Sequence, residues 1–306
     1  MPIVRTPEGM RDRLFNECAL RREQETELRV LFEHYGFSEV STPILEHYEL
    51  FTRTGSPFSE ETLVKVIDRA GRICVLRPDN TAPIARLAAS RLQNEKLPLK
   101  LWYQQPVYRV VGGGCAELPQ AGVEVIGSAE DTEVLKLALE AVRVAFRKEP
   151  HIEISHAGIL QTLISDLSPD SGRAEFIHSL IERKNFSALG DELPDARDFL
   201  ALLRLSGGAE VLDEAERTID IPLIEPLNEL RALLAALPSV TVDFGMAPAI
   251  GYYTGVFFRG YVDGAAGAVL TGGRYDRLLA PLGRDVPAVG FAIHQETHVP
   301  GRRRPC

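Results

Sequence analysis

The chain has 306 residues, of which 45% are hydrophobic and 25% are charged, and its formal net charge is −9. These values are ordinary for a globular protein with one large core and a smaller unit, and they exclude a collagen-like or disordered chain. The acidic balance, with no basic block except residues 302–304, argues against binding to nucleic-acid backbones through general charge attraction.

The N-terminus and the cysteines indicate where the protein acts. The opening MPIVRTPEGM has no apolar core of the length that a secretory signal needs, and no run approaches ~18 apolar residues. We therefore predict a cytoplasmic protein that does not bind membranes. His156 and His294 have no metal-ligand spacing and are interpreted as structural or surface residues, so neither a metal nor a cofactor is expected. The four cysteines form no CxxC pair: Cys18, Cys74, Cys115 and Cys306.

The first third of the chain alternates between helical and extended patterns. Apolar residues at helical spacing predict a long helix over 12–35, which Gly36 ends, and residues 37–40 are expected to be extended. The strand-like runs 62–67 and 72–77 are separated by DRAG, which has the composition of a turn. An antiparallel hairpin is therefore predicted.

A helix capped by Thr81 is predicted to run to Leu92, and a second hairpin follows it. The arms of this hairpin are residues 99–110 and 121–127, and Gly112–Gly114 are interpreted as part of a flexible, unbonded loop between them. Asp131 is expected to open another helix with one apolar face. That face contains Val134, Ala138, Val142 and Ala145.

The second half of the chain begins with short helical segments over 157–237 and then returns to strands. Residues 272–282 are predicted to turn into a helix before a last, buried strand over 286–293. The expected class is α+β, with an antiparallel sheet flanked by helices and interrupted by a helical insertion. The expected divisions are a core in two parts, 1–156 and 238–295, the helical insertion 157–237, and an atypical tail, 296–306. Further strands are predicted over 240–245, 252–262 and 267–271.

Six segments occur in an order and spacing that resemble the histidyl-tRNA synthetases. The opening TPEGMRD and the segment GFSEVSTPILE, which contains Pro43, are also similar to the entry and first motif of that family. The resemblance spans about 1–293 and implies a class II aminoacyl-tRNA synthetase-like fold that dimerises through the first motif. The six segments are LRPDNTAPIAR (76–86), LPLKLWYQQPVYR (97–109), LPQAGVEVIG (118–127), YYTGVFF (252–258), GGRYDRL (272–278) and PAVGFAI (287–293).

The same resemblance predicts that amino-acid activation is lost, so no catalytic residue is expected. Adenylation builds charge on phosphates, and the loss of one preorganised donor for such charge lowers the rate roughly 10²–10³-fold. Arg109 matches the arginine of the second motif, but uncharged residues replace other arginines at Ala116, Pro248 and Thr297, a glutamate at Val111 and an aspartate at Gly251.

The resemblance implies that the chain retains the histidine pocket of the synthetases. In such a pocket carboxylates face a cationic ammonium, and tyrosines enclose an imidazole ring. Gln120 and Glu124 could instead form a solvated polar face. Asp79 and Thr81 could each serve as a helix cap without contacting a ligand. Adjacent strand residues face opposite sides, which favours Tyr253 over its neighbour for the pocket. The implied binding residues are Asp79, Thr81, Arg109, Gln120, Glu124, Tyr252, Tyr253 and Tyr275.

The sequence ends at residue 306 and leaves no room for an anticodon-reading domain, so tRNA is not an expected partner. This set of features resembles the regulatory subunits of ATP phosphoribosyltransferase. The resemblance implies a homodimer that assembles with short-form catalytic subunits into a hetero-octamer, supports their activity and transmits feedback inhibition by histidine. The alternatives are an enzyme that adenylates histidine and a degenerate paralogue that serves only as a scaffold.

Overall fold

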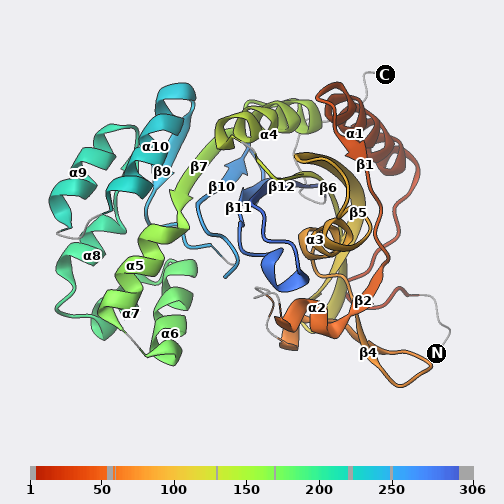
Figure 1. Cartoon of the computed structure of the whole chain (residues 1–306), viewed down its shortest axis with the longest axis horizontal. Helices are drawn as coiled ribbons and strands as arrows, with labels where there is room; N and C mark the ends of the chain where they lie inside the picture. Colours follow the sequence, from red (N-terminus) through yellow and green to blue (C-terminus); the bar gives the residue numbers. More distant parts are fainter. Residues whose placement is uncertain are drawn as a thin grey trace.

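The computed structural model describes residues 5–53, 58, 60–128, 130–168, 170–219, 223–248 and 251–295. Thr297 and the predicted tail 296–306 lie outside these residues. A large sheet occupies the middle of the molecule, long helices lie above it, and a group of shorter helices lies at its left side (Figure 1). None of the helices in the described ranges is long and apolar enough to cross a membrane.

The central sheet has nine strands in the order β1-β5-β6-β12-β11-β10-β7-β9-β8. Neighbouring strands are antiparallel except in two pairs, β1–β5 and β7–β9, which are parallel. The predicted α+β class is confirmed, with a mixed, mostly antiparallel sheet. The strands are β1 (Ser38–Glu39), β5 (Leu99–Val111), β6 (Gly114–Ile126), β7 (His151–His156), β8 (Ser206–Gly207), β9 (Val240–Asp243), β10 (Val256–Tyr261), β11 (Leu270–Arg274) and β12 (Ala288–His294).

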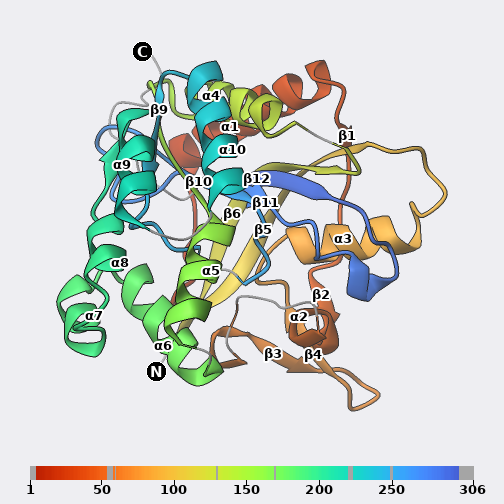
Figure 2. The same ribbon diagram turned by 60° about the vertical axis from the view of Figure 1, so that its left-hand side comes forward.

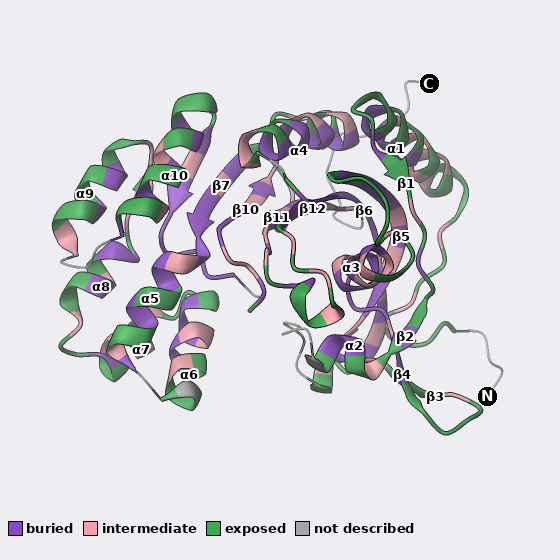
Figure 3. Cartoon of the chain, viewed as in Figure 1, coloured by how far each residue is buried: buried purple, intermediate pink, exposed green. Residues whose placement is uncertain are grey.

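Alternating side chains give this sheet one apolar face and a second face of mixed character, which we call the polar face because it carries Glu124 beside apolar residues such as Leu101. Val123 and Val125 of β6 belong to the main core, which the predicted helices α1 (Phe15–His34) and α4 (Asp131–Phe146) complete. Glu124, between the two valines, points to the opposite face, beside α3 (Thr81–Ser90). The four apolar residues predicted for one face of α4 are all buried. Burial follows the helical period in α4, whereas residues 119–126 of β6 are buried on both faces of the sheet (Figure 3).

The predicted loop between the arms of the second hairpin is wrong. Strands β5 and β6 continue in register to the pair Val111 and Gly114, and only Gly112 and Gly113 turn the chain. Their φ angles are +60° and +88°, in the left-handed region that glycine adopts without strain. The glycine-rich connection predicted over 112–120 is shorter in the structure, because pairing with β5 continues along residues 114–120 and overrides that local preference.

Gly113→Ala is expected to lower the free energy of unfolding by about 1 kcal/mol, because a Cβ is strained at this positive φ. Chemical denaturation of the variant and of Gly113→Asn checks this. Asparagine tolerates the left-handed region, so it should lose less stability than alanine. Equal stability of the alanine variant and the wild-type chain would contradict the assigned turn.

A second, smaller sheet confirms the first predicted hairpin. Its strand order is β2-β4-β3, and both pairs are antiparallel. Apolar side chains of these strands are exposed, among them Ile67 (73%) and Ile73 (47%). This surface is unusual for an isolated chain, because it places apolar area in water. The elements here are β2 (Leu45–His47), α2 (Tyr48–Arg53), η1 (Glu60–Thr62), β3 (Lys65–Ile67) and β4 (Ile73–Leu76).

The region predicted to be a helical insertion consists of six helices and the short strand β8 in its described part. These helices form the group at the side of the sheet, and Figure 2 shows them from a second direction. The domain boundaries themselves stay a prediction. The helices are α5 (Ala157–Leu167), α6 (Ser171–Glu182), α7 (Phe186–Glu192), α8 (Arg197–Leu202), α9 (Glu210–Thr218) and α10 (Ile224–Ala236).

The helix predicted over 272–282 does not form. Gly272 to Arg274 complete strand β11, and only the 3₁₀ turn η2 (Ala280–Leu282) follows. The apolar residues Leu278 and Leu279 that suggested a helix are buried in the second core cluster, against the polar face of the sheet. Leu278 and Leu279 therefore pack in the core although they do not belong to a helix.

Candidate functional site

A small cavity lies on the polar face of the central sheet, beside the start of α3. Gln120 and Glu124 are 4% and 1% exposed, so the alternative of a solvated polar face is wrong. All eight residues predicted to bind histidine line this cavity: Asp79, Thr81, Arg109, Gln120, Glu124, Tyr252, Tyr253 and Tyr275. The lining also contains residues that sequence reasoning missed, including Phe58, Asn80, Tyr103, Thr271, Gly290 and Phe291.

Glu124 is the most deeply buried acid of the cavity. Its Oε1 accepts a hydrogen bond from the Thr81 hydroxyl at 2.7 Å, and its Oε2 accepts one from the Tyr275 hydroxyl. Burial raises the pKa of Glu124 to about 8, against the opposing effect of both hydroxyl donors. The carboxyl group is therefore largely neutral at pH 7, and a cation beside it would favour its ionised form.

Gly290 makes the space that Glu124 occupies. A Cβ at position 290 would lie 1.9 Å from Glu124 Oε2 and 2.4 Å from the Val123 carbonyl oxygen. Gly122 has a similar role, since its Cβ would lie 2.5 Å from the Tyr103 hydroxyl oxygen. Glycines inside predicted strands are a sequence signal for such close approach.

Asp79 both caps α3 and faces the cavity. Its Oδ1 accepts from the Ala82 backbone N–H at 3.0 Å, whereas the Thr81 hydroxyl bonds to Glu124, so the predicted cap at Thr81 is wrong. Its Oδ2 is buried and has no hydrogen-bond partner among the described residues. Burial raises the pKa of Asp79 to about 6. A buried acceptor without a partner suits a donor from a ligand.

The three tyrosines form one aromatic wall. Tyr252 and Tyr253 have ring centroids 5.3 Å apart, and those of Tyr252 and Tyr275 are 5.8 Å apart, each pair tilted edge to face. Both Tyr252 and Tyr253 line the cavity, so the preference for one of them is wrong. Strand β10 begins only at Val256, and strand alternation does not apply before it.

Arg109 supplies a positive charge at the cavity wall. Its Nε donates to the Pro78 carbonyl oxygen at 2.8 Å, and its guanidinium lies 4.9 Å from the centroid of the Phe58 ring. Burial lowers the pKa of Arg109, an effect that the nearby Asp79 opposes. Together with Asp79 and Glu124 it can bind a ligand that carries both an ammonium and a carboxylate.

Comparison with known proteins gives the family. A sequence model of the histidyl-tRNA synthetase family matches residues 9–297. The ATP phosphoribosyltransferase regulatory subunit of Clostridium acetobutylicum is 37% identical, over 96% of this chain and 77% of the relative. That of Acetivibrio thermocellus is 36% identical, over 95% of this chain and 74% of the relative. The chain belongs to the histidyl-tRNA synthetase-like family of ATP phosphoribosyltransferase regulatory subunits.

Solved structures of this family agree with the fold. An ATP phosphoribosyltransferase regulatory subunit/histidyl-tRNA synthetase from Bacillus halodurans superposes with a TM-score of 0.88 at 32% identity, covering 96% of this chain and 82% of the other. The histidyl-tRNA synthetase of Nostoc superposes with a TM-score of 0.79 at 20% identity, over 95% of this chain and 73% of the other, and shows the shared fold alone. The expected class II synthetase-like fold is confirmed.

Uncharged residues stand at the described positions where the synthetase pattern led us to expect charge. Val111 is exposed beside the hairpin turn, Ala116 and Pro248 are buried, and Gly251 is exposed. Within the described lining of the cavity, Arg109 is the only arginine, and no group of three or more described His, Cys, Asp or Glu residues could hold a metal ion. That this chain has lost the catalytic arginines of the synthetases stays an inference from the synthetase sequence pattern.

The two histidines that the sequence left without a role are both structural in position. His156 ends β7 and caps α5, since its Nδ1 accepts from the Gly158 N–H, and its Nε2 lies 3.1 Å from Glu229 Oε2. His294 ends β12 directly opposite Gln120, and its ring lies between Gln120 and Thr271. The pairing of His294 with Gln120 across β12 and β6 associates His294 with the cavity. Sequence reasoning could not find this pairing, because the predicted last strand ended before His294.

Proposed function

We propose that this chain is a non-catalytic regulatory subunit of ATP phosphoribosyltransferase that binds free histidine in the cavity and regulates a short-form catalytic subunit. The observation that carries the proposal is the joint burial of Asp79 and Glu124 beside three tyrosines, in a family whose relatives bear the name of that regulatory subunit. The chemistry suits histidine, since carboxylates bind its ammonium and aromatic rings pack on its imidazole.

The absence of charge at Val111, Ala116, Pro248 and Gly251 supports regulation over amino-acid activation. Adenylation needs cationic groups for the phosphates, and the nearby arginines have other partners. Arg259 donates to the Ala247 carbonyl oxygen at 2.8 Å, and Arg274 lies 2.7 Å from Asp131.

For assembly, we propose that a homodimer forms through the first motif and the adjoining small sheet, within a hetero-oligomer with the catalytic subunit. The exposed apolar side chains of that sheet, such as Leu45, Val66 and Ile67, support an interface there.

The test is an activity assay of a short-form ATP phosphoribosyltransferase with and without this chain, followed by titration with histidine. The proposal expects activation by the chain and inhibition by histidine that appears only in its presence. The proposal is refuted if adding the chain changes neither the activity of the catalytic subunit nor its inhibition by histidine. Histidine-dependent ATP–pyrophosphate exchange by the chain alone would favour a ligase, and partner binding without any histidine effect would favour a scaffold.

The affinity for histidine is expected to rise with pH between about 6.5 and 8. A cationic ligand favours the ionised form of Glu124, whose pKa is raised to about 8 in the empty cavity, so binding releases a proton. One released proton corresponds to about a tenfold gain in affinity per pH unit below that pKa. Calorimetric titrations in buffers of different ionisation enthalpy measure the proton directly. A pH-independent affinity with no proton release would contradict this assignment.

A further inference from the structure

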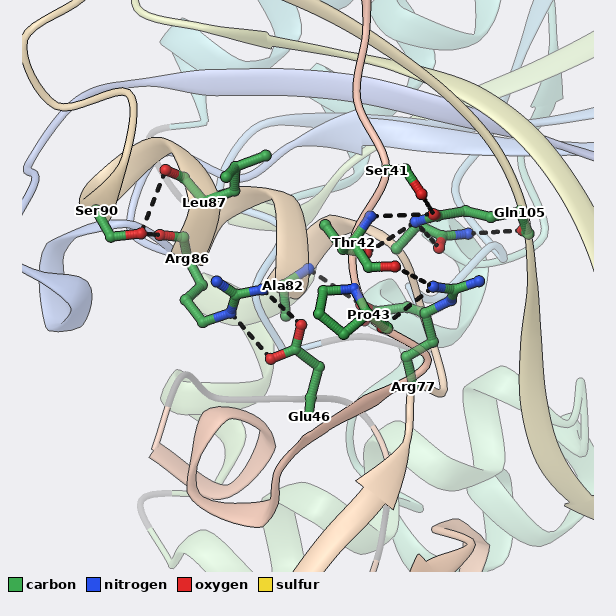
Figure 4. A network of polar contacts seen from close by, with 12 residues as sticks. Ser41, Thr42, Pro43, Glu46, Arg77, Ala82, Arg86, Leu87, Ser90 and Gln105 are labelled. Atoms are coloured by element: carbon green, nitrogen blue, oxygen red, sulfur yellow. Dashed lines mark hydrogen bonds and ion pairs between the residues drawn. The ribbon is translucent and has the colours of Figure 1, made fainter.

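A continuous chain of side-chain hydrogen bonds runs from the segment before β2, through the cavity wall, to β11. Figure 4 shows its beginning, where Gln105 lies against Ser41 and Thr42. The polar members that precede His294 are each at most 8% exposed, so water does not compete for these bonds. The members, in spatial order, are Thr42, Gln105, Asn80, Gln120, His294 and Thr271.

Backbone groups fix the direction of donation along this chain. The Thr42 N–H can only donate, so Oε1 of Gln105 faces it at 3.2 Å and the Gln105 amide nitrogen faces Asn80 Oδ1 at 2.8 Å. The side-chain nitrogen of Asn80 donates to the backbone carbonyl oxygen of Gln105, which can only accept, at 3.3 Å. It also donates to Oε1 of Gln120 at 3.3 Å. Gln120 therefore turns its amide nitrogen to Nδ1 of His294, at 3.3 Å.

These constraints leave a single protonation state for His294. Its Nδ1 must accept from Gln120, so the proton is on Nε2, which donates to the Thr271 hydroxyl oxygen at 3.0 Å. A charged imidazole would set an N–H against the amide N–H of Gln120. Burial, aided by the positive charge of Arg109, lowers the pKa of His294 to about 4 and agrees with this geometry.

We propose that His294 is a positioning residue of the cavity, whose neutral Nε2–H form holds the Gln120 amide in the one orientation presented to a bound ligand. Among the described residues, Gln120 bonds to Asn80 and His294 in the chain, which leaves its second N–H and a second lone pair to offer a donor and an acceptor at fixed places. Without an acceptor at position 294, the bond from Asn80 alone orients the amide, and the buried N–H that faced Nδ1 loses its partner, so the amide is held less firmly for a ligand.

The first test uses the wild-type chain without ligand. Long-range ¹H–¹⁵N spectra of protein with ¹⁵N-labelled histidine report the tautomer of each ring, and His294→Asn assigns the His294 signals. We expect a neutral Nε2–H ring down to about pH 5, given the lowered pKa of His294. A charged ring or an Nδ1–H tautomer at pH 7 would overturn the proposal, whatever the cavity binds.

The second test measures the affinity for histidine and rests on the proposed function for its choice of probe. His294→Phe keeps a planar ring without an acceptor and is expected to weaken binding about five- to tenfold. His294→Asn can place an oxygen near Nδ1 and should stay within about twofold of the wild type, as should the control His151→Asn on the exposed start of β7.

The outcomes separate the two proposals. Equal weakening by the Phe and Asn variants, or none by either, would reject positioning through Gln120. Absence of histidine binding by the wild-type chain would refute the proposed ligand, while the spectrum of the ring would still decide the state of His294.

Discussion

Glu124→Gln is expected to weaken histidine binding about 30-fold at pH 8, and isothermal titration calorimetry measures this loss. Glu124 is 1% exposed, and under the proposed function its carboxylate would meet the ammonium or an imidazole N–H of histidine between Thr81 and Tyr275. The amide keeps the shape of the side chain and removes its charge. A charge-assisted bond in a site without water is stronger than a neutral one, which sets the expected size of the loss.

The same variant is expected to be more stable than the wild type when the cavity is empty. Burial raises the pKa of Glu124 from 4.5 to about 8 in the folded chain. The unfolded chain therefore ionises first, and stability falls as pH rises from about 4.5 to about 8. Glutamine does not ionise, so this loss disappears and the midpoint of thermal unfolding at pH 8 should rise.

Glu117→Gln is the matched control for both measurements. Glu117 lies on the same strand, β6, seven residues away and thus on the other face, where it pairs with Arg13 at 3.4 Å. Its replacement should change the affinity less than about twofold. If both variants bind histidine as the wild type does, Glu124 does not contact the ligand and the assigned site is wrong.

Gly290→Ala is expected to lower the free energy of unfolding by about 3 kcal/mol, which is the largest loss of stability expected among these variants. The new Cβ would meet Glu124 Oε2 at 1.9 Å and the Val123 carbonyl oxygen at 2.4 Å. The carbonyl belongs to the neighbouring strand β6 and cannot move away without breaking the β6–β12 ladder. The Glu124 carboxyl must also leave its two hydroxyl partners, so binding of histidine should fall too.

Gly267→Ala tests whether the effect comes from the close approach or from any loss of glycine. No heavy atom lies within 4 Å of a Cβ at position 267, so this variant should change stability by less than about 0.5 kcal/mol. Urea unfolding of the three proteins makes the comparison. A Gly290→Ala variant as stable as Gly267→Ala would show that β12 does not pack against Glu124 as described.

Elements with local patterns could be predicted from the sequence alone. Helical spacing predicted α1 and α4, turn composition predicted the β3–β4 hairpin, and the ordered motifs identified the family together with the residues that line the cavity. Side-chain periodicity along a helix or strand needs no knowledge of what packs against it, which is why these predictions are confirmed.

Features that depend on partners far apart in the chain could not be predicted in this way. Pairing with β5 extends β6 to Gly114, packing keeps Leu278 out of a helix, and the chain before β10 brings Tyr252 and Tyr253 to the same cavity. The role of His294 depends on its register with Gln120, 174 residues away in sequence. Such positions are set by hydrogen bonds and burial between distant segments, and no local pattern contains that information.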